Sequence, residues 1–269
     1  MKETPQWLCL AGSITSLPAA TEGRVVVTGS HGGLFAAALA IRARFRAAVF
    51  HDAGGGREQA GIAGLEACTR TGMAAAAVSH ETACIGDARD VLARGRISHA
   101  NALASALGVR PGMPCREAAR LLAGAGLPER WDPPPIDEER HVLEGHGRRI
   151  LLVDSASLIR SEDEGAVIVT GSHGGLVDGD PGRALKADGF AAVFNDAGIG
   201  FRECGVRRLA VLDAKGTAGL AVDCMTARIG DARSSFEEGR ISRVNATAAR
   251  LGVTPGQSCR EAVMALAAM

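Results

Sequence analysis

Residues 24–34 read RVVVTGSHGGL, and residues 166–176 read AVIVTGSHGGL. The likeness continues downstream, where AAVFHDAGGG at 47–56 matches AAVFNDAGIG at 191–200. The two copies are 142 residues apart at the first motif and 144 residues apart at the second, so the second copy carries two extra residues. Agreement over roughly a hundred residues with one small gap indicates an internal duplication.

Each copy predicts alternating strands and helices. Short hydrophobic runs that end at glycine or at Asp-Ala-Gly are typical of strands, and MAAAAVS at 73–79 is interpreted as a third strand although alanine favours helix. Ser98 and Ser242 are expected N-caps of helices. The alternation predicts an α/β fold in which each copy forms a small, mostly parallel sheet with helices on both faces. The helices expected in the first copy span 57–71, 87–95, 98–108 and 114–125.

The duplication also sets the expected domain organisation. We expect a first α/β repeat over 1–127, a Pro-rich linker over 128–147 and a second repeat over 148–269. Three consecutive prolines at 133–135 favour an extended segment within the linker. By analogy with symmetric dimers, the two repeats are expected to be related by a pseudo-twofold axis and to face each other across a cleft.

Composition narrows the classes of protein. Lys plus Arg and Asp plus Glu both number 30, so there is no basic excess of the kind that nucleic-acid binding requires. Aromatic residues make up 3% of the chain, which also argues against base-stacking platforms. No apolar run is long enough to predict a membrane span or a signal peptide. Seven cysteines without a C-x-x-C pair favour a reducing, cytoplasmic location, and self-association into a homo-oligomer is compatible with this composition.

Polar motifs follow the predicted strands of both copies, and ligands of parallel sheets bind beyond the carboxyl ends of strands. A histidine between glycines gains little from helix propensity or packing, so His31 and His173 are candidate catalytic bases. Asp52 and Asp196 are expected to orient them or to act as acid or base. The candidate substrate-binding residues, whose loop N–H groups would hold an oxyanion or anion, are Gly29, Ser30, Gly32, Gly33, Gly171, Ser172, Gly174, Gly175, Asp87 and Asp231.

Positions that differ between the copies suggest specialisation. Cys84 corresponds to Arg228, and His51 corresponds to Asn195. Cys84 is a candidate nucleophile, with His31, His51 or His80 as its base, but a buried small hydrophobic residue is the competing interpretation. Arg228 is a candidate for binding a substrate carboxylate through two parallel hydrogen bonds.

Structural roles compete with these functional ones. The serines and aspartates could cap helices or form Asx turns. A divalent metal could instead be held by His31, Asp52 and Asp87, or by the matching residues of the second copy. The glycines after Asp52 resemble a dinucleotide fingerprint, but their spacing departs from G-x-G-x-x-G. Ser30 as a nucleophile lacks the G-x-S-x-G setting.

The residues together predict an enzyme that acts on a small polar or anionic metabolite. Hydrolysis of a C–N bond by His/Asp acid–base chemistry in a cleft between the repeats is the main hypothesis. A lyase or isomerase would use the same groups, and a binding or sensor protein is the alternative outside catalysis. The cofactor is unknown, either none or a divalent metal. No nucleic acid or membrane is expected as a partner.

Overall fold

The computed structural model describes residues 4–143 and 147–269. The chain divides into two compact units, each with its own sheet. Unit 1 comprises Met1–Gly54, Ala60–Ile136 and Val177–Gly179, and unit 2 comprises Gly55–Gln59, Asp137–Leu176 and Asp180–Met269. The fold is therefore α/β with two mostly parallel sheets, as the strand and helix pattern predicts. No helix in the described part of the chain is long and apolar enough to cross a membrane.

The sheet of unit 1 consists of β1 (Leu8–Ala11), β2 (Val25–His31), β3 (Ala47–His51), β4 (Ala74–Val78) and β5 (Ile97–Ala100). The strands lie in this order, with β1 to β4 parallel and β5 antiparallel to β4. Almost every residue of β2, β3 and β4 is buried, as expected for parallel strands that are covered on both faces. The loops that follow β2, β3 and β4 therefore emerge at one edge of the sheet.

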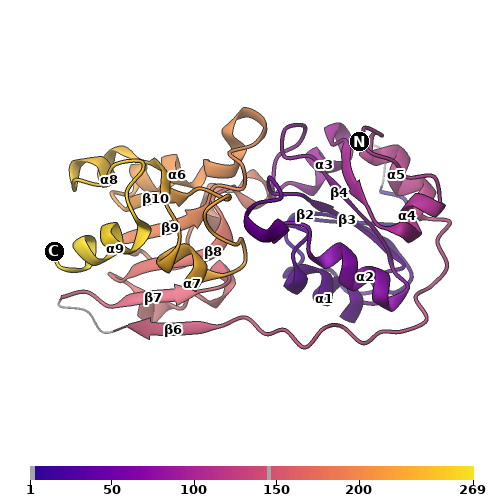
Figure 1. The fold of residues 1–269 in the computed structure, drawn as a ribbon, viewed down its shortest axis with the longest axis horizontal. Coiled ribbons are helices and arrows are strands. Elements are labelled where there is room, and N and C mark those ends of the chain that lie inside the picture. Colours follow the sequence, from indigo (N-terminus) through magenta and orange to yellow (C-terminus); the bar gives the residue numbers. More distant parts are fainter. Residues whose placement is uncertain (1–3, 144–146) are drawn as a thin grey trace. The chain divides into compact units, whose positions relative to one another are not determined.

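Helices cover both faces of this sheet (Figure 1). One face packs Val26, Ala48 and Phe50 against the first two helices. The other face packs Val25 and Val27 against the last three. The helices are α1 (Leu34–Arg42), α2 (Gly64–Thr71), α3 (Ala88–Arg94), α4 (Ala102–Ala106) and α5 (Cys115–Leu122). The 3-10 turn at Arg57–Gln59 lies between β3 and α2 in the sequence but belongs to unit 2.

The sheet of unit 2 consists of β6 (Arg140–Leu143), β7 (Ile150–Val153), β8 (Val167–His173), β9 (Ala191–Asn195), β10 (Ala218–Val222) and β11 (Ile241–Val244). β7 to β10 are parallel, and the outer strands β6 and β11 are antiparallel. The α-helices of unit 2 are α6 (Arg208–Ala214), α7 (Ala232–Glu237), α8 (Ala246–Arg250) and α9 (Cys259–Ala267). Its 3-10 turns span Ala156–Leu158, Ser161–Asp163, Val177–Gly179, Pro181–Arg183 and Phe201–Val206, although Val177–Gly179 packs with unit 1.

The structure differs from the sequence expectation in three places. The helix expected over 57–71 begins only at Gly64, because residues 57–59 form a 3-10 turn in which Glu58 and Gln59 have positive φ. Part of the stretch expected to be linker forms β6, which pairs with β7, while residues 144–146 of that stretch lie outside the described residues. Ser98 and Ser242 do not cap helices, because both lie in antiparallel strands. The caps are Asn101 and Asn245, whose side chains accept hydrogen bonds from the N–H groups three residues on.

Candidate functional site

The candidate residues of unit 1 stand at the carboxyl edge of three neighbouring strands. His31 is the register partner of His51, and His51 is the partner of Val78 on the next strand. Asp52 follows His51 directly, and its backbone N–H donates to the carbonyl of Val78 at 2.9 Å. Strands lie about 4.8 Å apart, so side chains from β2 to β4 share an edge roughly 10 Å wide. A small metabolite can span that width.

His51 has a structural role that Asn195 repeats in unit 2. The Nδ1 atom of His51 accepts the N–H of Ala53 at 3.1 Å, and its Nε2 lies 3.1 Å from the carbonyl oxygen of Ala83. In unit 2 the Asn195 side chain makes the matching bonds. Its Oδ1 accepts the N–H of Ala197 at 2.9 Å, and its Nδ2 donates to the carbonyl of Ala227 at 3.2 Å. Both nitrogens of His51 are thus used to hold loops, and burial lowers its pKa. His51 is not available as a base for Cys84.

This equivalence makes His51→Asn a mild substitution. Asparagine keeps one acceptor and one donor where the imidazole has them. His51→Leu removes the hydrogen-bond acceptor of the buried Ala53 N–H and the donor to the Ala83 carbonyl, and each lost bond costs about 1–3 kcal/mol. In urea unfolding, His51→Leu is expected to lose at least about 2 kcal/mol more than His51→Asn. Equal losses for the two variants would contradict the structural role.

His31 and His173 are held in one tautomer by their own loops. Nδ1 of His31 accepts the N–H of Gly33 at 3.1 Å, and Nδ1 of His173 accepts the N–H of Gly175 at 3.1 Å. A neutral imidazole that accepts at Nδ1 carries its proton on Nε2. Burial, with a further contribution from His51, lowers the pKa of His31 to about 4. His31 is therefore neutral at physiological pH and suited to donate a hydrogen bond rather than to act as the base.

The lowered pKa of His31 makes the fold sensitive to acid. The unfolded imidazole takes up a proton below its ordinary pKa of 6.5, and the folded one does so only near 4, so the unfolded state binds more protons between these values. Stability is expected to fall by about 2–3 kcal/mol as the pH drops through this window. His31→Asn keeps an acceptor for Gly33 and removes the titration. Unfolding measured at about pH 7 and about pH 4 should show a smaller loss in the variant, and identical losses would contradict this.

The Gly-Ser-His-Gly-Gly loop of unit 1 uses its polar groups internally. The N–H of Gly32 donates to the carbonyl of His51 at 3.0 Å, in addition to the bond from Gly33 to His31. The Ser30 hydroxyl accepts the N–H of Ile14 at 3.0 Å and so ties the loop to the segment after β1. These amides and this hydroxyl hold the loop itself, which is the structural role that competes with the expected oxyanion or nucleophile role.

The matching loop of unit 2 follows the same scheme. The N–H of Gly174 donates to the carbonyl of Asn195 at 2.9 Å, and the Ser172 hydroxyl accepts the N–H of Ala156 at 2.9 Å. Gly29 and Gly171 are needed for close packing. A Cβ on Gly29 would lie 2.4 Å from a backbone atom of the Ile-Gly-Asp-Ala loop, and one on Gly171 would lie 2.5 Å from the equivalent loop.

The remaining expected binding residues have partners within their own units. Asp87 caps α3 by accepting the N–H groups of the second and third residues after it, and Asp231 caps α7 by accepting the N–H of the third residue after it. The Arg228 guanidinium is 3.1 Å from Asp231 and 3.4 Å from Glu238, so carboxylates of the protein already bind it. Cys84 is 5% exposed, in agreement with the buried interpretation rather than with a nucleophile open to solvent.

Asp52 forms a pair with His80, the second residue after β4. Its Oδ1 atom accepts the backbone N–H of His80 at 2.8 Å and lies 3.1 Å from His80 Nδ1. The Asp52 side chain is 5% exposed and the His80 side chain 25% exposed, so the carboxylate is buried behind an imidazole that reaches the surface. Burial alone would raise the pKa of Asp52, but the bond from His80 and the nearby His51 outweigh it and lower the pKa to about 2. The carboxylate stays ionised and orients the ring.

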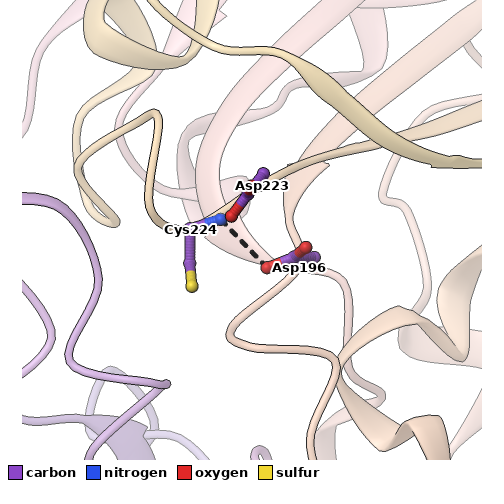
Figure 2. Close-up of side chains that lie close together, drawn as sticks. All are labelled: Asp196, Asp223 and Cys224. Atoms are coloured by element: carbon purple, nitrogen blue, oxygen red, sulfur yellow. Dashed lines mark hydrogen bonds between the residues drawn. The ribbon is translucent and has the colours of Figure 1, made fainter. Parts of the chain in front are cut away.

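The same corner of unit 2 has different chemistry, shown in Figure 2. Asp196 Oδ1 accepts the backbone N–H of Cys224 at 3.0 Å, as Asp52 does from His80. Asp223 precedes Cys224 where unit 1 has Ser79. The ligand atoms of Asp196, Asp223 and Cys224 all lie within 4.8 Å of one another. Burial raises the pKa of Asp196 and, together with the two carboxylates, raises the pKa of the Cys224 thiol to about 12.

In the part of the chain that the structure describes, this cluster is the one group of three side chains placed to hold a metal ion. The expected set of His31, Asp52 and Asp87 does not gather in this way, because Asp87 is turned to its helix and His31 to its own loop. Carboxylate oxygens and a sulfur form a donor set that suits zinc.

A strained turn follows the buried aspartate in both units. Ala53 and Ala197 each have a φ of 51°, in the left-handed region that costs a non-glycine residue about 1–3 kcal/mol. The turn lets the next glycine, Gly54 or Gly198, donate its N–H to the carboxylate at 3.0 Å. Both carboxylates are thereby fixed toward the end of the next strand.

The sequence did not predict three residues that lie beside the buried aspartates at the carboxyl edges of the two sheets: His80 in unit 1, and Asp223 and Cys224 in unit 2. The sequence predicts His80 only as a possible base for Cys84. Their position in the sequence could have indicated them, because all three lie one or two residues beyond the end of β4 or β10. They lie outside the motifs that the two copies share, and the sequence does not show that they approach the buried aspartates.

Comparisons of the chain with protein-family models, with curated proteins and with solved structures find no match. The function is therefore argued from the site alone.

Proposed function

We propose that this protein is an enzyme that hydrolyses a C–N bond of a small polar or anionic metabolite by acid–base chemistry. The observation that carries the proposal is the 3.1 Å contact between His80 Nδ1 and Asp52 Oδ1 at the carboxyl edge of unit 1. A carboxylate bound to Nδ1–H leaves Nε2 as the basic nitrogen and stabilises the imidazolium that forms. The neutral His31, two strands away, offers an Nε2–H donor to the same edge.

The proposed reaction uses these three side chains as follows. Water attacks the carbonyl carbon of an amide, and Nε2 of His80 takes its proton as the C–O bond forms. The carbonyl oxygen gains negative charge and accepts a hydrogen bond from Nε2–H of His31. His80 then gives the proton to the nitrogen as the C–N bond breaks. Asp52 stays ionised throughout and holds the ring.

The proposal places the acid–base pair in unit 1 because, among the described residues of unit 2, no histidine forms an ion pair with Asp196. Position 224, which corresponds to His80, is a cysteine. His173 shares the tautomer of His31 and so resembles a donor rather than a base. The pseudo-twofold relation between the sequence copies, the cytoplasmic location and self-association remain predictions of the sequence.

A screen in water enriched in heavy oxygen tests the proposal. The purified chain would be incubated with linear amides, cyclic amides and ureas, and products followed by mass spectrometry. Hydrolysis is expected to place one heavy oxygen atom in the new carboxyl group, and His80→Gln is expected to abolish the product. Turnover without heavy oxygen would replace the proposal with a lyase or isomerase. Binding of a ligand without turnover would replace it with a sensor.

A further inference from the structure

The equivalent corners of the two units differ in charge. In unit 1 the buried Asp52 has an imidazole at 3.1 Å as its partner. In unit 2 the equivalent Asp196 is 3% exposed and is joined by a second carboxylate, that of Asp223. Among the described residues, no Lys, Arg or His forms an ion pair with either carboxylate. This corner therefore lacks the positive charge that unit 1 has. A buried carboxylate is costly unless it is paired, protonated or bound to a metal.

The corner of unit 2 also has sulfur in place of that positive charge. Cys224 is 4% exposed, and its Sγ lies within 4.8 Å of carboxylate oxygens of Asp196 and Asp223. Figure 2 shows the three side chains grouped at the ends of two neighbouring strands, β9 and β10. We propose that Asp196, Asp223 and Cys224 form a binding site for a divalent zinc-type ion. This inference is independent of the hydrolytic function proposed for unit 1.

The distances are compatible with one shared ion. Zinc lies about 2.0–2.2 Å from carboxylate oxygens and about 2.3 Å from sulfur in a tetrahedral arrangement, so two ligand atoms of one ion are roughly 3.4–3.6 Å apart. The three ligand atoms lie within 4.8 Å of one another, so binding requires the side chains to rotate and bring these atoms about 1 Å closer together. When the ion binds, the thiol proton leaves to solvent and the thiolate coordinates in its place.

The surroundings of the ligands support the site. Asp196 Oδ1 is fixed by the N–H groups of Gly198 and Cys224, each at 3.0 Å, and Asp223 Oδ1 accepts the N–H of Met225 at 2.8 Å. Such hydrogen bonds orient metal ligands before the ion arrives. The thiolate favours zinc over magnesium or calcium, which prefer oxygen alone. Three protein ligands leave a fourth position for water or for a substrate atom.

Metal titration of the full chain tests this site without any assay of activity. The protein would be treated with a chelator, then titrated with Zn²⁺ by calorimetry and with Co²⁺ by absorption. We expect one ion per chain and a thiolate-to-cobalt absorption band in the near ultraviolet. Mg²⁺ should not compete. Absence of binding by the folded chain, or a cobalt spectrum without the thiolate band, would overturn the site.

Variants assign the binding to these residues. Cys224→Ser is expected to remove the band, and Asp223→Asn to weaken Zn²⁺ binding by about 100-fold or more. Cys84→Ser, at a buried cysteine of unit 1, is the control and should leave both unchanged. If Cys224→Ser does not fold by circular dichroism, the partly exposed Asp223 decides the question. Unchanged affinity in Asp223→Asn would overturn the proposal.

Discussion

Replacing Asp52 by Asn is expected to lower turnover about 10²–10⁴-fold once a substrate is in hand. Asparagine fills the same space and still accepts the backbone N–H of His80, which the carboxylate now accepts at 2.8 Å. It carries no charge, so it neither fixes Nδ1–H as firmly nor stabilises the imidazolium. The loss should fall on kcat, because Asp52 is a positioning residue that is 5% exposed.

Two matched variants separate this effect from a general disturbance of the fold. Asp196→Asn removes the equivalent carboxylate of unit 2, where no histidine is oriented, and should leave the base of unit 1 intact. His80→Gln combined with Asp52→Asn should cost little more than His80→Gln alone, because the carboxylate acts through the ring. An equal loss of turnover in Asp52→Asn and Asp196→Asn would contradict the proposed Asp52–His80 pair. Full additivity of the two losses in the double variant would contradict it as well.

Gly29→Ala is expected to destabilise unit 1 by about 3 kcal/mol, the upper end of the cost of overpacking. The added Cβ would lie 2.4 Å from the carbonyl carbon of Gly86 and 2.5 Å from the backbone nitrogen of Asp87. Backbone cannot move aside as a flexible side chain can. The change should show as a lower midpoint in urea unfolding.

Gly126→Ala is the control for this prediction. A Cβ at Gly126 meets nothing within 4 Å, so alanine there should be neutral or slightly stabilising, by less than about 1 kcal/mol. If Gly29→Ala unfolds with the wild-type midpoint but loses ligand binding, then the loop glycine serves a ligand rather than the packing of two loops.

The fold could be predicted from the sequence to a large extent. Short runs such as AAVF at 47–50 and AGLAV at 218–222 alternate with helical stretches in both copies, and such a pattern specifies parallel strands covered on both faces. The antiparallel strand at Ile97–Ala100 was not predicted, because its sequence ISHA also fits the start of a helix. Its pairing with β4, a tertiary contact, decides between the two.

The candidate site could be predicted only as a region. The sequence placed polar residues at the carboxyl ends of strands, and the structure has them there. It did not show which groups are already satisfied. His51 looks reactive in the sequence, but Ala53 and Ala83 occupy both of its nitrogens. Conversely, His80 lies outside the repeated motifs, and its contact with Asp52 depends on the register of two strands.

The state of His80 in solution tests the central claim most directly. Nitrogen chemical shifts of the labelled imidazoles report which ring nitrogen carries the proton, and a His80→Gln sample assigns the signal. The pair with Asp52 requires the proton of neutral His80 on Nδ1, opposite to His31, and a shift toward the Nε2 form in Asp52→Asn. A wild-type His80 with its proton on Nε2, unchanged in Asp52→Asn, would contradict the account.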